Sequence, residues 1–159
     1  MKKQRKSKSY DKKLQTMGKI VVLVLILSVL LSLGLSFKGK EIIITKSDCI
    51  LEVYQGVWKI KSFPITTGGE SSPTSNGEFK VLDKIEDVES YHGYIFPRWL
   101  GVYEVGPYEN GIHSVKGENS WNECIGISNC TPGSIIMYEQ DMEWLYNWAD
   151  LETMVIIDI

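Results

Sequence analysis

The chain has 159 residues, with 17 Lys and Arg against 20 Asp and Glu, and its net charge of −3 hides a strong asymmetry. Residues 1–19 hold eight basic residues and one acidic residue, whereas residues 38–159 hold nine basic and nineteen acidic ones. Three cysteines and two histidines without close ligand pairs do not make a zinc site. The odd number of cysteines means that they cannot all pair, and a Cys124–Cys130 disulfide is compatible with the spacing.

The first predicted element is one transmembrane helix. Residues 20–37 form an uncharged apolar run of eighteen residues. As a helix this run extends about 27 Å, slightly less than a hydrocarbon core of about 30 Å, and the flanking Lys19 and Lys38 can reach the headgroups. The basic tail at 1–19 places the N-terminus in the cytoplasm and the rest of the chain outside the cell membrane. We expect this tail to rest on anionic lipid and not to bind nucleic acid.

A cleaved signal peptide is the alternative interpretation of the same run. Gly34-Leu35-Ser36 provides small residues at the spacing of a cleavage site before Phe37. The apolar run is longer than the usual signal-peptide core and the segment before it is long, which favours a retained anchor. In both cases about 120 residues remain outside, enough for one domain, which we expect at 41–159.

The external part is predicted to be mostly β. Gln55-Gly56 indicates the turn of a first hairpin, and residues 66–76, rich in Gly, Ser, Thr and Pro, indicate a loop. One convincing helix is expected at 139–148, with acidic residues near its N-terminus and a single apolar face. Strands are expected at 41–46, 49–54, 57–63, 77–83, 99–103, 111–115 and 154–159, with an acidic loop at 86–89.

Three segments in this order resemble the catalytic domain of the L,D-transpeptidases, enzymes that cross-link peptidoglycan. The first is FPITTG at 63–68 with PTSNGEFKV at 73–81, similar to the family's "fPvSTG…TPxGeFkI". The second is NGIHS at 110–114, similar to "gIHs", and the third is TPGSIIM at 131–137, similar to "ShGCIRm". The resemblance covers residues 41–158 and implies an L,D-transpeptidase-like β-sandwich with one short helix, acting on peptidoglycan stem peptides without a cofactor or metal.

The resemblance places the catalytic histidine on His113 and the family's cysteine nucleophile on Ser134. The family's arginine falls on Ile136 and its second histidine on Pro132. Gly133, Thr131 and Ser114 fall on positions where we expect contacts with the substrate. If the domain is active, the implied reaction is attack on the amide carbonyl before the terminal D-residue of a stem peptide. Backbone N–H groups around Gly133 would then stabilise the oxyanion.

Cys130 is the alternative nucleophile. Cys130 follows His113 by 17 residues, and Ser134 follows His113 by 21 residues. The shorter separation is closer to the family spacing. The match without gaps downstream of Ser134 favours the serine. Cys124, in a segment that loosely echoes the family motif, and Cys130 are otherwise interpreted as small buried hydrophobes or as a disulfide.

Two further hypotheses follow from the altered motif. A serine hydroxyl, unlike a thiol, needs a base close by before it can act, so the domain is alternatively a catalytically silent module that binds peptidoglycan or regulates another protein. No residue that would orient the imidazole of His113 is recognisable in the sequence. A sortase-type transpeptidase also fits a basic tail, an anchor and an external β domain, but the expected Thr-Leu-x-Thr-Cys segment and its downstream arginine are missing.

Overall fold

The computed structural model describes residues 15–31, 39–90, 93–116, 120–127 and 129–158, and the chain divides into two compact units, residues 1–38 and 39–159. In the first unit residues 15–31 are helical. No helix within the described residues meets the length and apolarity needed to cross a membrane. Residues 1–14 of the basic tail and residues 32–37 of the predicted anchor lie outside the described residues.

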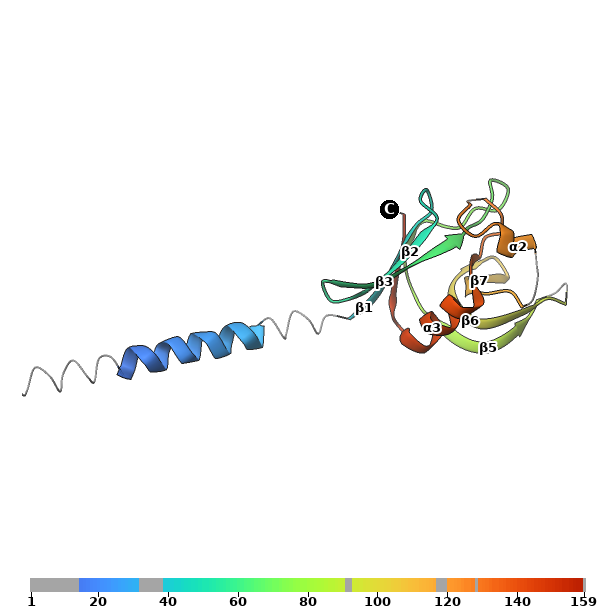
Figure 1. Cartoon of the computed structure of the whole chain (residues 1–159). Helices are drawn as coiled ribbons and strands as arrows, with labels where there is room; N and C mark the ends of the chain where they lie inside the picture. The colour runs from blue at the N-terminus through green and yellow to red at the C-terminus, as the bar shows by residue number, and fades with distance from the viewer. Residues whose placement is uncertain (1–14, 32–38, 91–92, 117–119, 128, 159) are drawn as a thin grey trace, which may run out of the picture. The chain divides into compact units, whose positions relative to one another are not determined.

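The second unit is built on a sheet whose strand order is β4-β9-β1-β2-β3-β8-β7-β6-β5 (Figure 1). Neighbouring strands are antiparallel except for the β1–β9 and β7–β8 pairs, which are parallel. Two helices accompany the sheet, α2 (Ser120–Glu123) and α3 (Glu139–Trp148). The strands are β1 (Lys40–Thr45), β2 (Ile50–Gln55), β3 (Trp58–Thr66), β4 (Gly77–Lys80), β5 (Asp83–Glu89), β6 (Ile95–Val105), β7 (Tyr108–His113), β8 (Ile135–Met137) and β9 (Met154–Ile157).

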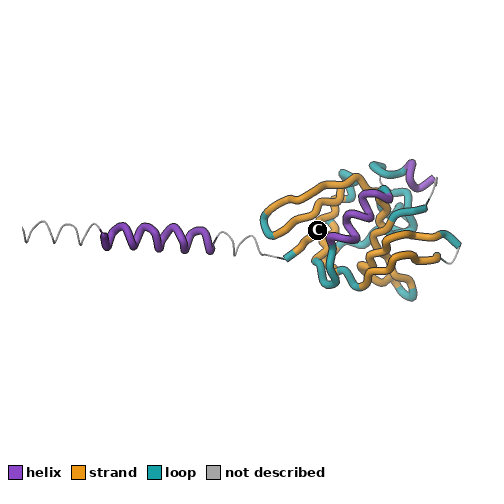
Figure 2. The backbone as a smooth tube through the Cα atoms, turned by 60° about the horizontal axis from the view of Figure 1, so that its bottom comes forward, coloured by secondary structure: helices purple, strands orange, loops and turns teal. Residues whose placement is uncertain are grey.

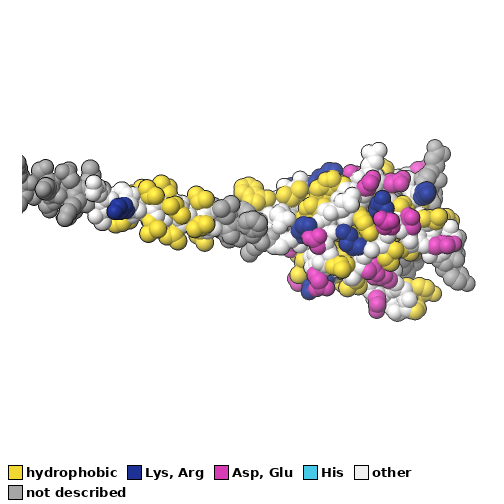
Figure 3. All heavy atoms as spheres, turned by 90° about the horizontal axis from the view of Figure 1, so that it is seen from below, with side chains coloured by type: hydrophobic (Ala, Val, Ile, Leu, Met, Phe, Trp, Pro, Cys, Tyr) yellow, Lys and Arg dark blue, Asp and Glu magenta, His cyan; other side chains and the backbone are white. Residues whose placement is uncertain are grey.

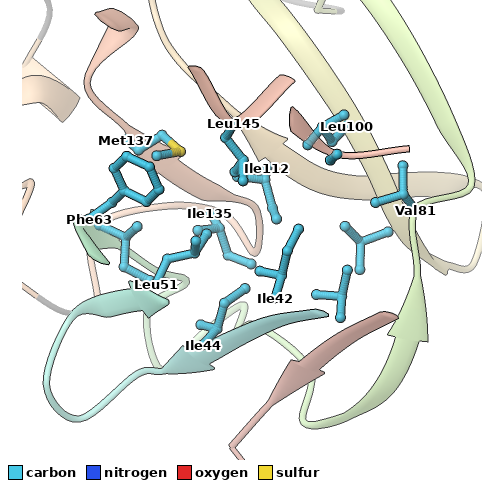
Figure 4. Close-up of a cluster of buried hydrophobic side chains, with 14 of the residues drawn as sticks. Ile42, Ile44, Leu51, Phe63, Val81, Leu100, Ile112, Ile135, Met137 and Leu145 are labelled. Carbon is cyan, nitrogen blue, oxygen red and sulfur yellow. The ribbon is translucent and has the colours of Figure 1, made fainter. Parts of the chain in front are cut away.

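The strand β3 connects the two halves of the sheet. Its first part pairs with β2, and its last residues, Ile65 and Thr66, pair with β8. Buried side chains from both halves and from α3 form one cluster, so the halves face each other across a shared core (Figures 2 and 4). Ile42 and Ile44 supply it from β1, and Met142 and Leu145 from α3. Full burial of each such side chain stabilises the fold by about 1.5–3 kcal/mol.

The structure confirms the mostly β fold and the helix at 139–148, and it adds the short helix α2. The predicted acidic loop at 86–89 is wrong, because these residues belong to β5 and pair with β6. β5 is the last strand in the sheet order, and an edge strand accepts charged residues that a central strand would exclude. The predicted strand 77–83 is also divided, since β4 ends at Lys80 and β5 begins at Asp83.

Candidate active site

The parallel pair β7–β8 brings the histidine segment beside the Ser134 segment. Ile112 pairs with Ile135, and His113 pairs with Ile136. Since Ile112 and Ile135 belong to the core cluster, alternation along the strands directs His113 to the other face of the sheet, the face that Ser134 also shares. Strand spacing and rise place the Cα atoms of His113 and Ser134 roughly 8 Å apart.

The imidazole of His113 is almost completely buried between two aromatic rings. Its centroid lies 4.2 Å from the Phe96 ring and 5.2 Å from the Trp99 ring, which is stacked on it. Nδ1 lies 3.0 Å from the carbonyl oxygen of Ser114, and because a carbonyl can only accept, Nδ1 carries the hydrogen and donates it. Nε2 of the neutral ring is therefore left with its lone pair.

Burial determines the protonation of His113. Removal from water disfavours the imidazolium and lowers the pKa of His113 from its usual 6.5 to about 4, and the hydrogen bond to the Ser114 carbonyl opposes only part of this shift. The ring is therefore neutral at pH 7. It is available as a base, but a weak one.

Ser134 makes its hydrogen bonds with β7 at positions before His113. Its hydroxyl donates to Oδ1 of Asn110 at 3.2 Å and accepts a long bond from the backbone N–H of Gly111 at 3.5 Å. Within the described part of the chain, no hydrogen bond joins the ring of His113 to Ser134. The proton that a base would have to remove is thus directed at a neutral amide oxygen.

Gly133 is held from two sides by buried hydroxyl groups. Its carbonyl oxygen accepts hydrogen bonds from Oγ1 of Thr74 at 2.7 Å and from the phenol of Tyr103 at 2.9 Å. The residue has a φ of +120°, and a Cβ atom there would lie 2.9 Å from Oδ1 of Asn110. Both observations explain why glycine occupies this position next to Ser134.

The amide of Gly133, one of the backbone groups near the predicted oxyanion site, makes a hydrogen bond within its own turn. Its N–H is directed at Oγ1 of Thr131, at 3.3 Å, and the hydroxyl of Thr131 in turn donates to the carbonyl oxygen of Ser134. Thr131, predicted to contact substrate, is buried and acts inside this turn. The N–H of Gly133 and the hydroxyl of Thr131 are therefore both engaged within this turn.

The other predicted positions lie close by in different environments. Ser114 is fully buried, and its hydroxyl donates to the carbonyl of Pro97 at 3.1 Å. Ile136 is buried beside His113 in the sheet. Pro132 is exposed, and its carbonyl accepts a hydrogen bond from Ser72 at 2.8 Å.

Cys130 is joined to Cys124 in a disulfide, so the alternative nucleophile is not a thiol in this structure. The backbone of Cys130 lies beside the end of β3, because its N–H donates to the carbonyl of Thr67 at 2.9 Å. The third cysteine, Cys49, is free and buried, and burial raises the pKa of its thiol. Neither position supplies a thiolate beside His113.

A pocket of about 630 Å³ has Ser134 and Asn110 in its wall. Most of the lining is aromatic or aliphatic, with Tyr94, Phe96, Trp99, Tyr108 and Trp121 as the ring-bearing residues. Behind Asn110, the backbone of Gly111 packs closely on the Trp99 ring, from which a Cβ atom at Gly111 would lie 2.9 Å away. A pocket of this size and composition accommodates a short peptide segment.

Two polar features of the pocket escaped the sequence analysis. Nε1 of Trp99 is buried and has no hydrogen-bond partner among the described residues. The pKa of Glu109 is raised, first by burial and then by the charge of Asp83 and the hydrogen bond with it.

Asn110 was visible in the motif, but nothing in the sequence linked it to Ser134, a residue 24 positions away. Only the pairing of β7 with β8 brings these two residues into contact.

The comparisons with known proteins define the class of this domain. The model of the YkuD family, the L,D-transpeptidase catalytic domain, matches residues 39–157. The chain therefore belongs to the L,D-transpeptidase family of cell-wall cross-linking enzymes. None of the curated protein sequences compared with it is significantly similar.

Solved structures share the fold. An L,D-transpeptidase from Mycobacterium smegmatis is 18% identical, with a TM-score of 0.65 over 76% of this chain and 59% of that one. One from Stackebrandtia nassauensis is 19% identical, with a TM-score of 0.65 over 77% and 56% of the two chains. One from Mycobacterium tuberculosis H37Rv is 21% identical, with a TM-score of 0.64 over 76% and 58%. The chain thus matches about three fifths of the length of these proteins.

Proposed function

We propose that residues 39–159 form a module that binds peptidoglycan stem peptides in the Ser134 pocket and has lost thiol-based acyl transfer. The observation that carries the proposal is the hydrogen bond from the hydroxyl of Ser134 to Asn110, at the residue that the sequence resemblance aligns with the family's cysteine. The thiol nearest in sequence is absent because Cys130 is joined to Cys124.

The acid–base properties of the site support this loss. A serine hydroxyl becomes a nucleophile only when a base within about 3 Å takes its proton. The hydroxyl of Ser134 is bonded elsewhere, and the low pKa of His113, about 4, makes the imidazole a poor proton acceptor. With Ile136 at the position of the family's arginine, the side chain there has no planar donor fork to hold a carboxylate.

Peptide binding is supported by the pocket itself. Its aromatic lining offers flat apolar surface, and Nε1 of Trp99 is a buried donor without a partner in the described residues. Leaving such a donor unpaired costs about 1–3 kcal/mol, and a peptide carbonyl is the kind of acceptor it lacks. Asn110 adds an amide at the end of the pocket next to Ser134.

A second candidate function is slow acyl transfer with Ser134 as nucleophile. It is favoured by the neutral ring of His113, whose Nδ1 is fixed by Ser114 and whose Nε2 is unprotonated. This is the protonation state that a general base requires. His113 would take the proton of the Ser134 hydroxyl, which attacks the amide carbonyl before the terminal D-residue, and that residue would leave as an amine with the proton. The acyl group on Ser134 would then pass to an amine or to water.

Anchorage in the cell membrane belongs to the same proposal. Residues 20–37 would span the bilayer once, with the basic residues 1–19 in the cytoplasm and the β domain outside. Protease added to intact protoplasts should digest the β domain and spare the tail. Protection of the domain until lysis would refute the orientation.

The binding and chemistry are tested on the full chain in detergent micelles. Isolated tetrapeptide muropeptides should bind, and Trp121→Ala in the pocket should weaken binding by roughly tenfold, since buried aromatic anchors dominate such interfaces. Trp58→Ala, on an exposed hairpin away from the pocket, is the matched control. Mass spectrometry after exposure to a carbapenem should find no covalent adduct. An adduct on Ser134 would establish the second candidate, and absence of binding would refute both.

A further inference from the structure

The β2–β3 hairpin exposes apolar side chains near its turn. Val57 is 64% exposed, Trp58 63% and Ile60 47%, and all of residues 58–62 are exposed although they belong to β3. In the described residues β3 pairs with β8 only at Ile65 and Thr66, so the first half of β3 is paired with a strand on the β2 side alone. The register shifts between Val53 and Tyr54, which bends the hairpin there.

This hairpin turn lies where the chain enters the β domain. The N–H of Gly56 donates to the carbonyl of Gly39 at 3.3 Å, and Lys40 pairs with Gln55. Figures 1 and 2 show the turn at the same end of the domain as the start of β1, and Figure 3 shows hydrophobic side chains at that end. In the sequence, Phe37, the last residue of the apolar run, precedes Gly39 by two residues.

We propose that the β2–β3 turn docks the domain on the outer surface of its own membrane, with Val57, Trp58 and Ile60 entering the headgroup region. The inference rests on the proposed anchorage of residues 20–37 and is independent of peptide binding. A bilayer holding that run would come within a few residues' length of Gly56. Tryptophan is enriched at this depth because its ring is apolar and its N–H remains hydrated.

The charges around the hairpin indicate an apolar contact more than an electrostatic one. Lys59 forms an ion pair with Glu52 at 2.8 Å, and Lys61 lies over the Phe63 ring and 3.7 Å from Asp141. Because the protein's own acidic groups accompany these lysines, docking should depend little on anionic lipid or on salt. A lipid surface would also shield the edge of β3 that faces away from β2 from pairing with another strand.

The test uses the full chain in liposomes that contain nitroxide-labelled lipid, with a fluorophore on Val57→Cys. Cys49 is buried and the other two cysteines form a disulfide, so labelling is confined to the new thiol. The control label is on Tyr108→Cys, which is exposed at the start of β7. β7 runs antiparallel to β3 through β8, so Tyr108 and Trp58 lie at opposite ends of the strand direction.

Lipid nitroxide should quench the label at position 57 several-fold more than the label at position 108, equally in zwitterionic and anionic vesicles. Ile60→Ser should lower the docked-to-undocked ratio roughly fivefold. About half of the Ile60 side chain is exposed, so its transfer into lipid contributes about half of the free energy of full burial. Leu82→Ser, which removes a side chain that is 49% exposed elsewhere, is the matched control and should change nothing.

Three results would overturn the docking surface. Equal quenching at positions 57 and 108 in a chain that floats with vesicles refutes docking and leaves anchorage intact. A label at position 57 that is shielded from aqueous iodide but untouched by lipid nitroxide shows that another protein chain covers the hairpin. A full chain that fails to float refutes anchorage and docking together, and muropeptide binding by the unlabelled chain is measured separately.

Discussion

The two walls of the candidate site differ in what they preserve. The β7 wall retains Asn-Gly-Ile-His-Ser at 110–114, and its imidazole is fixed by two aromatic rings and a backbone carbonyl. In the facing segment at 131–136, the replaced wall, Thr74 and Tyr103 hold the carbonyl of Gly133, and the sequence resemblance places other side chains where the family has those of its chemistry. The fold is therefore maintained by groups that do not depend on the reaction.

The replaced wall is also a stable arrangement. Ile136 is buried in the sheet beside His113, where a charged residue would need a buried partner. Ser134 satisfies its hydroxyl through Asn110 and Gly111. Under the proposed function, the residues in this segment keep Ile136 buried and the hydroxyl of Ser134 hydrogen-bonded.

The largest loss of stability is expected from a change at Thr74, whose hydroxyl holds the backbone of the replaced wall. Thr74→Val removes the donor to the carbonyl of Gly133 and the acceptor of the N–H of Gly68, both buried. Loss of these two bonds should lower the free energy of unfolding by about 3 kcal/mol. Thr45→Val is the control, because no side-chain hydrogen bond of Thr45 is found in the described chain, and it should change stability by less than about 0.5 kcal/mol. Equal effects would show that the segment at 131–136 is not fixed by Thr74.

The β7 wall should respond to pH through His113. Its folded pKa of about 4 lies below the usual 6.5, so the folded state binds fewer protons and stability falls as pH decreases from 6.5 toward 4. Between pH 7 and pH 4.5 the wild type should lose about 2.5 kcal/mol more than His113→Phe, which keeps a ring between Phe96 and Trp99. Urea unfolding at the two pH values measures this difference. Identical losses in both proteins would mean that the imidazole is not buried as described.

The disulfide next to the replaced wall should contribute slightly less to the free energy of unfolding than the pH-dependent contribution of His113. The bond between Cys124 and Cys130 closes a loop with a sequence separation of 6, which corresponds to about 2 kcal/mol in the chain-entropy model. The double substitution Cys124→Ser with Cys130→Ser should lower the free energy of unfolding by this amount. A reductant should destabilise the wild type equally and leave the double variant unchanged. Insensitivity of the wild type to reductant would contradict the pairing.

The fold was predictable where local patterns match the tertiary environment. The buried alternation of Ile42 and Ile44 and the apolar face of α3 each show a clear period, and both elements form as expected. β5 was missed because its charged sequence resembles a loop, and its strand state depends on pairing with β6. The sequence alone does not contain the information that this strand lies at the edge of the sheet.

The candidate site was predictable only in part for a similar reason. The motif identified His113, but the group that orients its ring is the carbonyl of Ser114, and every residue has such a group. The bond between Ser134 and Asn110 requires strands far apart in sequence to pair. The hydrogen bond from the amide of Gly133 to the side chain of Thr131 became visible only with the geometry of the turn. The catalytic roles of His113 and Ser134 stay predictions.

The smallest change in stability is expected from Ser134→Cys, although its chemical consequence tests the contrast between the walls most directly. Replacing the hydroxyl weakens one hydrogen bond to Asn110 and should cost about 1 kcal/mol or less. A thiol is intrinsically nucleophilic and a few per cent ionised near neutral pH, so a carbapenem should acylate this variant where the wild type remains unmodified. Ser72→Cys, a thiol elsewhere in the same pocket, is the control for nonspecific reaction.

Mass spectrometry of tryptic peptides identifies the acylated residue in that experiment. Acylation of Ser134→Cys that disappears with His113→Gln would show that the β7 wall is still competent and that the nucleophile alone was lost. An unreactive Ser134→Cys would place the loss also at Pro132 and Ile136. Turnover by the wild type that Cys130→Ala abolishes and Ser134→Ala leaves untouched would contradict the disulfide and assign the nucleophile to Cys130. In that case the two walls would not differ in catalytic competence, and the domain would be an active transpeptidase with a local insertion.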